Sequence, residues 1–221
     1  MPKQSQHFMT DKKILQRICN YANLNKDDTV LEIGAGTGNL TFEIAKFAAV
    51  YAIEKDEKLV AGLEKIKNKN IRIIRGDALK LTFPNFNKIV SNIPYGISRK
   101  ITLKLLEYKF NLGILTVQKE FAEKLTASAG SKNYKFISSA AQSSWDIKIL
   151  EYVSQQAFSP VPDVKSAIVE IKPSRDFDEN YIEFIRNLFN HRNKKIKDTG
   201  KRIYELNPGE LLELYNNQNK K

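Results

Sequence analysis

The sequence predicts an α/β fold in which a mainly parallel sheet carries helices on both faces. Short runs rich in β-branched residues alternate along the 221-residue chain with stretches of helical periodicity, which is the pattern of βαβ units. The first such run ends in a glycine-rich turn, GAGTG at 34–38, and a helical stretch follows. These observations favour a Rossmann-like arrangement, and the length fits one full domain with a small appendage.

The predicted elements follow in order along the chain. The first helix covers residues 11–24, with Thr10 as its N-cap. Seven strands are expected at 29–33, 50–53, 71–74, 88–91, 112–117, 145–152 and 165–171. Helices are expected between or after the first five strands at 39–48, 56–67, 98–108 and 118–128. The long loop QQAFSPVPDVK joins the last two strands, which suit a hairpin at the edge of the sheet.

The character of the sequence changes around Pro173. Helices are expected over 178–191 and 208–216, and the basic run HRNKKIKDTGKR lies between them. We therefore divide the chain into a main domain, residues 1–173, and a small C-terminal helical region, residues 174–221. That region is too short for a substantial core of its own, so it is expected to pack on the main domain.

Composition narrows the classes of partner and site. The chain has 36 lysines and arginines against 25 acidic residues, a net charge of +11, which favours a polyanionic partner such as nucleic acid. Cys19 is the only cysteine and there are two histidines, so neither a disulfide within the chain nor a Cys- or His-based metal site is expected. The polar N-terminus and the lack of long apolar runs predict a cytoplasmic protein without a membrane segment.

The glycine turn and the ends of the next two predicted strands indicate a cofactor site. Asn39 stands where the GxGxxG dinucleotide pattern has its third glycine, which disfavours NAD. The GxGxG spacing, preceded by Glu32, suits S-adenosylmethionine better, because carboxylates stabilise its sulfonium and amino group. Glu54 ends the second strand, where it can accept hydrogen bonds from ribose hydroxyls, and Asp77 follows the third, where it can accept one from the adenine amino group.

The segment Ser91-Asn92-Ile93-Pro94-Tyr95, at the end of the fourth strand, predicts the chemistry. The lone pair of an adenine amino group is delocalised into the ring, so the group is a poor nucleophile. The Asn92 side-chain carbonyl and a main-chain carbonyl, of Ile93 or Pro94, can accept its two N–H hydrogens and favour a pyramidal nitrogen. Pro94 fixes the turn, and Tyr95 can stack on the base, which is worth about 1–3 kcal/mol. Transfer of a methyl group in line then needs no strong general base.

In order, these motifs resemble those of the rRNA adenine N6,N6-dimethyltransferases, the KsgA/Dim family with its Erm relatives. The resemblance covers roughly residues 4–200. It rests on QHFM at 6–9, EIGAGTGNLT at 32–41, AIEKD at 52–56, GDAL at 76–79, SNIPYGIS at 91–98, QKEFAEKL at 118–125, AFSPVPDVKSAIV at 157–169 and FNHRNKKIK at 189–197.

The resemblance implies a class I S-adenosylmethionine-dependent methyltransferase with a small C-terminal helical domain that contacts RNA. Such enzymes dimethylate two adjacent adenines in a hairpin near the 3′ end of small-subunit rRNA during ribosome biogenesis. It implies a monomer whose partner is this rRNA or the pre-ribosomal small subunit. The implied cofactor contacts are His7, Met9, Gly34, Gly36, Glu54, Asp77 and Asn92. The implied catalytic pocket contains Asn92, Pro94, Tyr95 and Phe158, with the target base sandwiched between Tyr95 and Phe158.

Two basic clusters are candidates for holding RNA phosphates. Arg99 and Lys100, with Lys104, follow the catalytic segment. A second cluster lies within residues 190–202 and contains Arg192, Lys194, Lys195 and Lys197, together with Lys201 and Arg202. The competing interpretation of either cluster is a solvated helix face.

The chain also departs from the family pattern. His7 replaces the usual Asn, Met9 replaces Leu, and Ser91 replaces Gly or Ala, so side-chain roles at 7 and 9 are open; the C-terminal region is also shorter than usual. QKE at 118–120 and FNHRNKK at 189–195 favour the KsgA/Dim branch over an Erm-like enzyme acting on one large-subunit adenine. Two competing functions are a DNA adenine methyltransferase, which usually has proline where Ile93 stands, and a non-catalytic ribosome-assembly or transcription factor.

Overall fold

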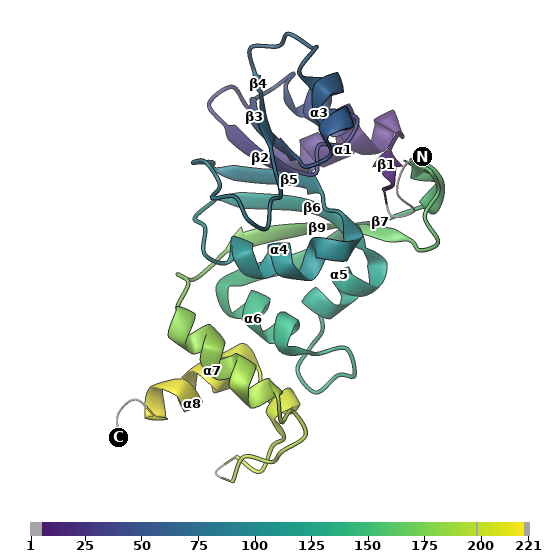
Figure 1. Cartoon of the computed structure of the whole chain (residues 1–221). Coiled ribbons are helices and arrows are strands. Elements are labelled where there is room, and N and C mark those ends of the chain that lie inside the picture. Colours follow the sequence, from purple (N-terminus) through teal and green to yellow (C-terminus); the bar gives the residue numbers. More distant parts are fainter. Residues whose placement is uncertain (1–5, 198, 219–221) are drawn as a thin grey trace.

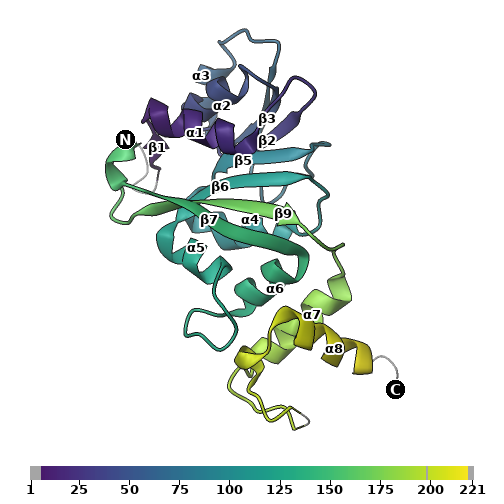
Figure 2. The same ribbon diagram turned by 180° about the vertical axis from the view of Figure 1, so that it is seen from behind.

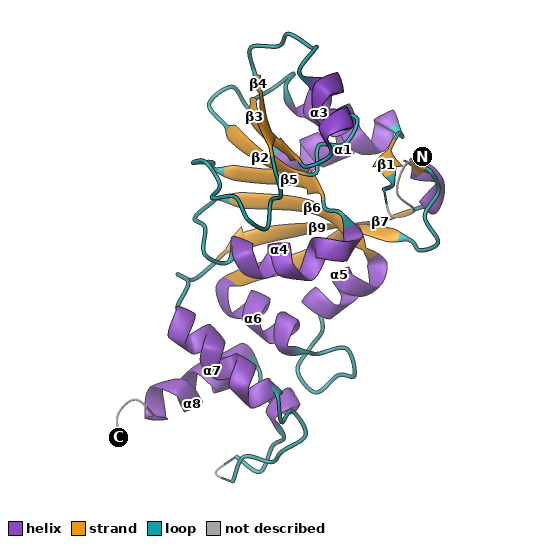
Figure 3. Ribbon diagram, viewed as in Figure 1, coloured by secondary structure: helices purple, strands orange, loops and turns teal. Residues whose placement is uncertain are grey.

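The computed structural model describes residues 6–197 and 199–218. One sheet runs through its centre in the order β4-β3-β2-β5-β6-β9-β7 (Figures 1 and 3). The strands β2 to β6 are parallel to one another, and β9 pairs antiparallel with both β6 and β7. The strands are β2 (Thr29–Ile33), β3 (Ala49–Glu54), β4 (Ile71–Arg75), β5 (Lys88–Asn92), β6 (Leu112–Gln118), β7 (Trp145–Val153) and β9 (Ser166–Pro173). The predicted mainly parallel sheet of seven strands is confirmed, with β7 and β9 as its edge hairpin.

The strand order reverses between β2 and β5, because the chain builds outward on one side through β3 and β4 and returns to add β5 on the other side. In open α/β sheets the ligand crevice lies at such a switch point, beyond the carboxyl ends of the strands. The glycine turn follows β2, and the Asn-Ile-Pro-Tyr segment begins at the last residue of β5. The topology therefore places these two motifs side by side.

Helices cover both faces of the sheet, because alternate strand residues point to opposite sides. Val30 packs in the layer of α1 (Lys12–Ala22), α2 (Asn39–Ile44) and α3 (Glu57–Leu63). Leu31 and Ile33 pack in the layer of α4 (Ser98–Leu105), α5 (Lys119–Leu125) and α6 (Phe136–Ser144). Figures 1 and 2 show these layers from opposite sides. Among the described residues, no helix has the length and apolar character that crossing a bilayer requires.

Several local details differ from the sequence predictions. The helices α2 to α5 each end three or four residues before the predicted end. The N-cap of α1 is Asp11 instead of Thr10, because the Asp11 carboxylate accepts hydrogen bonds from the amides of Lys13 and Ile14. The helix α6 was not predicted. A separate two-stranded pair, β1 (Phe8–Met9) with β8 (Phe158–Ser159), joins segments far apart in the sequence and was also not predicted.

The C-terminal region packs against α6 at one end of the molecule (Figure 1). It consists of α7 (Glu179–Phe189), a basic loop and α8 (Pro208–Gln218). Buried side chains of both helices, including Ile185 and Leu211, belong to the same apolar cluster as α4, α5 and α6. The region therefore shares its core with the main domain.

Candidate active site

The glycine turn after β2 packs directly against two other segments. Gly34 and Gly36 have φ angles of 79° and 60°, which favour glycine. A Cβ atom on Gly34 would lie 2.9 Å from Cγ of Pro94, and one on Gly36 would lie 2.7 Å from Cδ1 of Phe8. Glycine at these positions therefore lets the turn, the Asn-Ile-Pro-Tyr segment and the N-terminal strand β1 meet.

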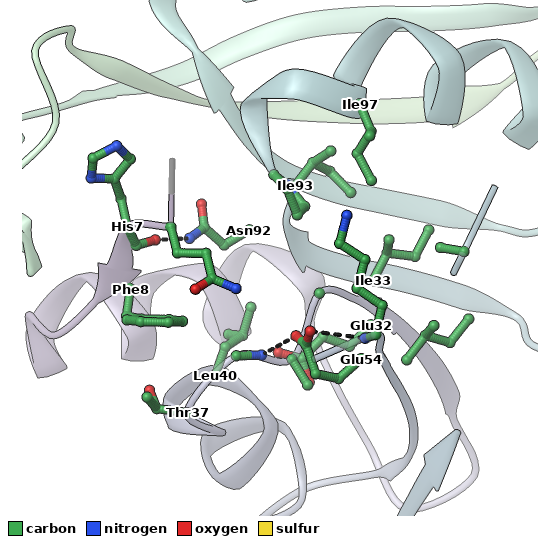
Figure 4. Close-up of a pocket in the computed structure, with 18 of the residues that line it drawn as sticks. His7, Phe8, Glu32, Ile33, Thr37, Leu40, Glu54, Asn92, Ile93 and Ile97 are labelled. Atoms are coloured by element: carbon green, nitrogen blue, oxygen red, sulfur yellow. Dashed lines mark hydrogen bonds between the residues drawn. The ribbon is translucent and has the colours of Figure 1, made fainter. Parts of the chain in front are cut away.

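These segments enclose a cavity of about 210 Å³ at the carboxyl edge of the sheet (Figure 4). The cavity joins the glycine turn to the Asn-Ile-Pro-Tyr segment, which is the arrangement that the proposed chemistry requires. All predicted cofactor contacts line it, as do two further predicted catalytic residues; together these are His7, Met9, Gly34, Gly36, Glu54, Asp77, Asn92, Pro94 and Tyr95.

Glu54 is held rigidly at the end of β3. Its carboxylate accepts hydrogen bonds from the backbone amides of Gly36 (2.9 Å), Lys55 (2.8 Å) and Asp56 (2.9 Å). Three amide donors fix the orientation of this carboxylate between the glycine turn and the start of α3. Lone pairs on its oxygens can still accept hydroxyl donors from a ligand in the cavity.

Glu32 is a second carboxyl group in the wall of the cavity, and it is fully buried. Burial raises the pKa of Glu32 to about 8, although a hydrogen bond from the Thr41 hydroxyl at 2.6 Å opposes this shift. A cationic ligand placed close to this carboxyl group would favour its ionised form.

Asp77 lies in the loop after β4 and lines the cavity. One of its carboxylate oxygens accepts a hydrogen bond from the amide of Leu79 at 2.9 Å, and its carbonyl accepts bonds from the amides of Lys80 and Leu81. These bonds make a compact turn that fixes the Asp77 backbone at the wall of the cavity.

Asn92, the last residue of β5, carries a polar atom without a partner. Its Nδ2 donates a long hydrogen bond, 3.4 Å, to the carbonyl of His7 (Figure 4). Its Oδ1 is buried and has no hydrogen-bond partner among the described residues. A buried carbonyl oxygen without a donor costs about 1–3 kcal/mol, so its position beside the cavity calls for a ligand donor.

Tyr95 also lines the cavity. Its hydroxyl forms a 2.6 Å hydrogen bond with the Ser166 hydroxyl in β9, and burial raises its pKa. The His7 ring lies against the Tyr95 ring with centroids 5.9 Å apart. Phe158, by contrast, is 2% exposed, packs in the apolar cluster with Met9, and is not among the residues that line the cavity. The structure thus brings Tyr95 to the site and leaves Phe158 in the core beside β1.

Two contacts that hold the N-terminal strand over the cavity were not predicted from the sequence. Asn39 donates a hydrogen bond from Nδ2 to the carbonyl of Met9 at 2.8 Å. The His7 ring nitrogen Nδ1 lies 2.9 Å from the carbonyl of Pro160. These contacts connect residues 30 to 153 positions apart, and no local sequence signal indicates them.

The basic side chains after the catalytic segment divide into two groups. Arg99 and Lys100 are exposed at the start of α4, and neither forms an ion pair within the described part of the chain. Lys104 points inward and donates hydrogen bonds to the carbonyls of Ala78 and Leu81. The expectation that Lys104 holds a phosphate is therefore wrong, because its ammonium group is occupied by the protein.

The basic loop between α7 and α8 contains both exposed and occupied side chains. Lys194, Lys195 and Lys197 are exposed. Arg192 lies over the ring of Tyr204, with its guanidinium carbon 4.9 Å from the ring centroid. Lys201 forms an ion pair with Glu210. The three exposed lysines are thus the part of this loop most available to a polyanion.

Comparison with known sequences finds relatives named as ribosomal RNA methyltransferases. A family model described as ribosomal RNA adenine dimethylase matches residues 2–219. A protein of Methanosarcina acetivorans, named a probable ribosomal RNA small subunit methyltransferase A, is 44% identical in an alignment of 203 residues that covers 88% of this chain and 75% of that protein. A Thermococcus sibiricus protein of the same name is 41% identical in an alignment of 205 residues that covers 91% of this chain and 75% of that protein.

Solved structures agree with the sequence comparison. A dimethyladenosine transferase from Plasmodium falciparum superposes with a TM-score of 0.88 at 26% identity, over 96% of this chain and 98% of that one. The 23S rRNA methyltransferase ErmE superposes with a TM-score of 0.73 at 25% identity, over 95% of this chain and 98% of that one. The fold is therefore the methyltransferase fold that the sequence predicts.

Proposed function

The chain belongs to the ribosomal RNA adenine dimethylase family of methyltransferases, and on that premise we propose that it transfers methyl groups from S-adenosylmethionine to N6 of two adjacent adenines. The proposed substrate is a hairpin near the 3′ end of small-subunit rRNA during ribosome biogenesis, since the relatives from Methanosarcina and Thermococcus carry small-subunit names. The observation that carries the chemistry is the unpartnered Oδ1 of Asn92 in the wall of the cavity.

The residues of the cavity fit S-adenosylmethionine, which when bound supplies an activated methyl group. The glycine turn allows a close approach of backbone to ligand, and Glu54 lines the cavity with oxygens that suit the ribose hydroxyls. Asp77 and Glu32 also line the cavity. The Asp77 carboxylate would accept a hydrogen bond from the adenine amino group, and Glu32 would offer a carboxyl group to the cationic part of the molecule. His7 and Met9 line the cavity on the side of β1 and would contact the cofactor from there.

The target adenine would present its amino group to two acceptors. The first is Oδ1 of Asn92. Of the two candidate main-chain carbonyls, that of Pro94 already accepts hydrogen bonds from the amide of Ile97 at 3.0 Å and the hydroxyl of Ser98 at 3.3 Å. We therefore choose the carbonyl of Ile93 as the second acceptor. With both N–H hydrogens held, the nitrogen lone pair is free to receive the methyl group.

The base would stack on Tyr95, whose ring orientation is fixed by the hydrogen bond to Ser166. The ring of His7 lies on Tyr95 in this structure, so the base would displace it. Stacking on Phe158 as well requires β1 and β8 to separate, because Phe158 pairs with Met9. The sandwich of Tyr95 and Phe158 is therefore proposed only for an open form of the N-terminal strand.

Phosphates flanking the extruded adenine would contact Arg99 and Lys100, which are exposed beside the catalytic segment. More distant phosphates would contact the three exposed lysines of the basic loop, and Arg192 would support that loop through Tyr204. We propose that the protein acts as a monomer in the cytoplasm, on rRNA or on the pre-ribosomal small subunit.

Primer extension across small-subunit rRNA tests this function. Dimethylated adenines block reverse transcriptase, so two adjacent stops should disappear in cells that lack the protein and return when it is restored. Restoration by an Asn92→Ala variant would contradict the mechanism. Purified protein given labelled S-adenosylmethionine with small-subunit rRNA, large-subunit rRNA and duplex DNA separates the proposed activity from an Erm-like and a DNA-directed one. No transfer to any of them would favour a non-catalytic factor.

A further inference from the structure

The helix α4 links the two halves of the site. It begins at Ser98, directly after the catalytic segment, and its last turn lies against the loop 76–83 that contains Asp77. Two side chains four residues apart, Lys104 in α4 and Tyr108 just beyond it, both bond to the backbone of this loop. The helix ends at Leu105 and Tyr108 follows it, so the last turn of α4 and the segment directly after it contact the loop together.

Lys104 binds the first part of the loop. Its Nζ donates one hydrogen bond to the carbonyl of Ala78 at 2.7 Å and another to the carbonyl of Leu81. Nζ also lies 4.3 Å from the centroid of the Phe83 ring. Burial lowers the pKa of Lys104, in keeping with an ammonium group drawn away from solvent. An ammonium group has three N–H donors, so the two carbonyls and the aromatic face together give it a full set of partners.

Tyr108 binds the other end of the same loop. Its hydroxyl oxygen accepts a hydrogen bond from the amide of Phe83 at 3.1 Å, and the two rings pack with centroids 4.8 Å apart. The loop is thus held at Ala78, Leu81 and Phe83 by side chains that all belong to one short segment. Asp77, one residue before Ala78, takes its position from the loop that these contacts hold.

We propose that Lys104 is a positioning residue for the cofactor: it fixes the loop 76–83 against α4 and so sets the place of Asp77 relative to the catalytic segment. The inference rests on the proposed function, in which the Asp77 carboxylate accepts a hydrogen bond from the amino group of the cofactor's adenine. Lys104 is not among the residues that line the cavity, and it acts on affinity through the backbone of Ala78. Its loss should therefore weaken cofactor binding and leave the chemical step nearly intact.

The test compares Lys104→Met with Lys80→Met. The first keeps most of the apolar stem and removes the donors, and the second changes an exposed lysine of the same loop. Calorimetry with S-adenosylmethionine and S-adenosylhomocysteine should show a dissociation constant raised roughly tenfold in Lys104→Met and unchanged in Lys80→Met. The KM for the cofactor should rise in parallel, with kcat within about twofold, and Lys104→Arg should recover most of the affinity.

A double-mutant cycle with Asp77→Asn separates positioning from general stability. If Lys104 acts through Asp77, the two losses of affinity overlap. Adding Lys104→Met to the Asp77→Asn variant should then raise the dissociation constant by less than about twofold. Losses that multiply would overturn the proposal, as would a folded Lys104→Met protein with wild-type affinity.

If thermal unfolding shows that Lys104→Met does not fold, Tyr108→Phe serves in its place. It should also raise the cofactor KM without changing kcat, and a wild-type KM or a fall in kcat alone would overturn the proposal. Wild-type protein that binds neither cofactor ligand would refute the proposed function itself, which is a different outcome from a variant that binds normally.

Discussion

Replacing Asn92 by leucine is expected to change activity and stability in opposite directions. Leucine has the same number of side-chain heavy atoms and the same branch point as asparagine but no polar atoms. The Oδ1 of Asn92 is buried without a donor among the described residues, and its Nδ2 makes only one long hydrogen bond, at 3.4 Å. An unsatisfied buried acceptor costs about 1–3 kcal/mol, while so long a bond returns little. The leucine variant should therefore be as stable as wild type or more stable by about 1 kcal/mol, a rise in Tm of roughly 2–4 °C.

The same substitution should nearly abolish methylation. Removal of one polar group that acts on the transition state typically costs about 10²–10³ in rate, and Asn92 is proposed to hold one of the two N–H hydrogens of the reacting amine. The assay is transfer of labelled methyl groups to small-subunit rRNA under single-turnover conditions, with RNA affinity measured by filter binding on the same samples. RNA affinity should stay close to wild type, because the phosphate contacts lie elsewhere.

Ser91→Ala provides the matched control, one residue earlier. The Ser91 hydroxyl is buried but satisfied: it donates to the carbonyl of Ile33 at 2.7 Å and accepts from the amide of Ile33 at 3.2 Å. Its removal should lower stability by about 1–2 kcal/mol and change the methylation rate far less than Asn92→Leu. An Asn92→Leu protein that methylates at the wild-type rate, or that loses several kcal/mol of stability, would refute the reasoning, since Asn92 would then be a structural residue.

Three further predictions concern other parts of the molecule. Burial raises the pKa of Glu32 from 4.5 to about 8, so the free energy of unfolding should be highest below pH 4.5 and should fall as the pH rises through 8. Glu32→Gln should flatten this fall in denaturant titrations, and an unchanged pH profile would contradict the prediction. Gly36→Ala should weaken cofactor binding, measured by calorimetry, because its Cβ would strike the Phe8 ring, whereas Gly62→Ala, with open space around it, should bind normally. The exposed lysines of the basic loop are Lys194, Lys195 and Lys197. Neutralising all three should reduce the slope of log Kd for RNA against log salt concentration by roughly two, without changing kcat. An unchanged slope would mean that these lysines are only solvated surface.

The sequence could predict the parts of the site that depend on strand order. The glycine turn, Glu54, Asp77 and Asn92 each follow a predicted strand, and the carboxyl ends of parallel strands meet at one edge, so these four had to come together. Boundaries came out within a few residues for the same reason: β2 covers Thr29–Ile33 as predicted. Local sequence pattern and sheet topology were together sufficient to predict this part of the site.

The parts that could not be predicted depend on contacts between distant segments. The helix α6 has the sequence FISSAAQSS, whose serines favour caps and turns over helix interiors, so its helical form depends on its packing against α4 and α5. The β1 and β8 pair has two residues on each side and no periodicity to detect. Lys104 lies in a basic stretch, and only the position of the loop 76–83 turns its side chain inward.

The cofactor cavity and the basic loop lie at separate places in this fold. The cavity is at the carboxyl edge of the sheet, while the basic loop extends from the C-terminal helices beyond α6 (Figures 1 and 2). The loop is braced by its own contacts, Arg192 on Tyr204 and Lys201 with Glu210, and none of these four residues lines the cavity. RNA affinity and the rate of the chemical step should therefore respond to different substitutions. When a substitution at each place is combined, their free-energy effects should add. Strong coupling between a basic-loop variant and Asn92→Ala would mean that RNA bound at the loop helps to place the adenine in the cavity.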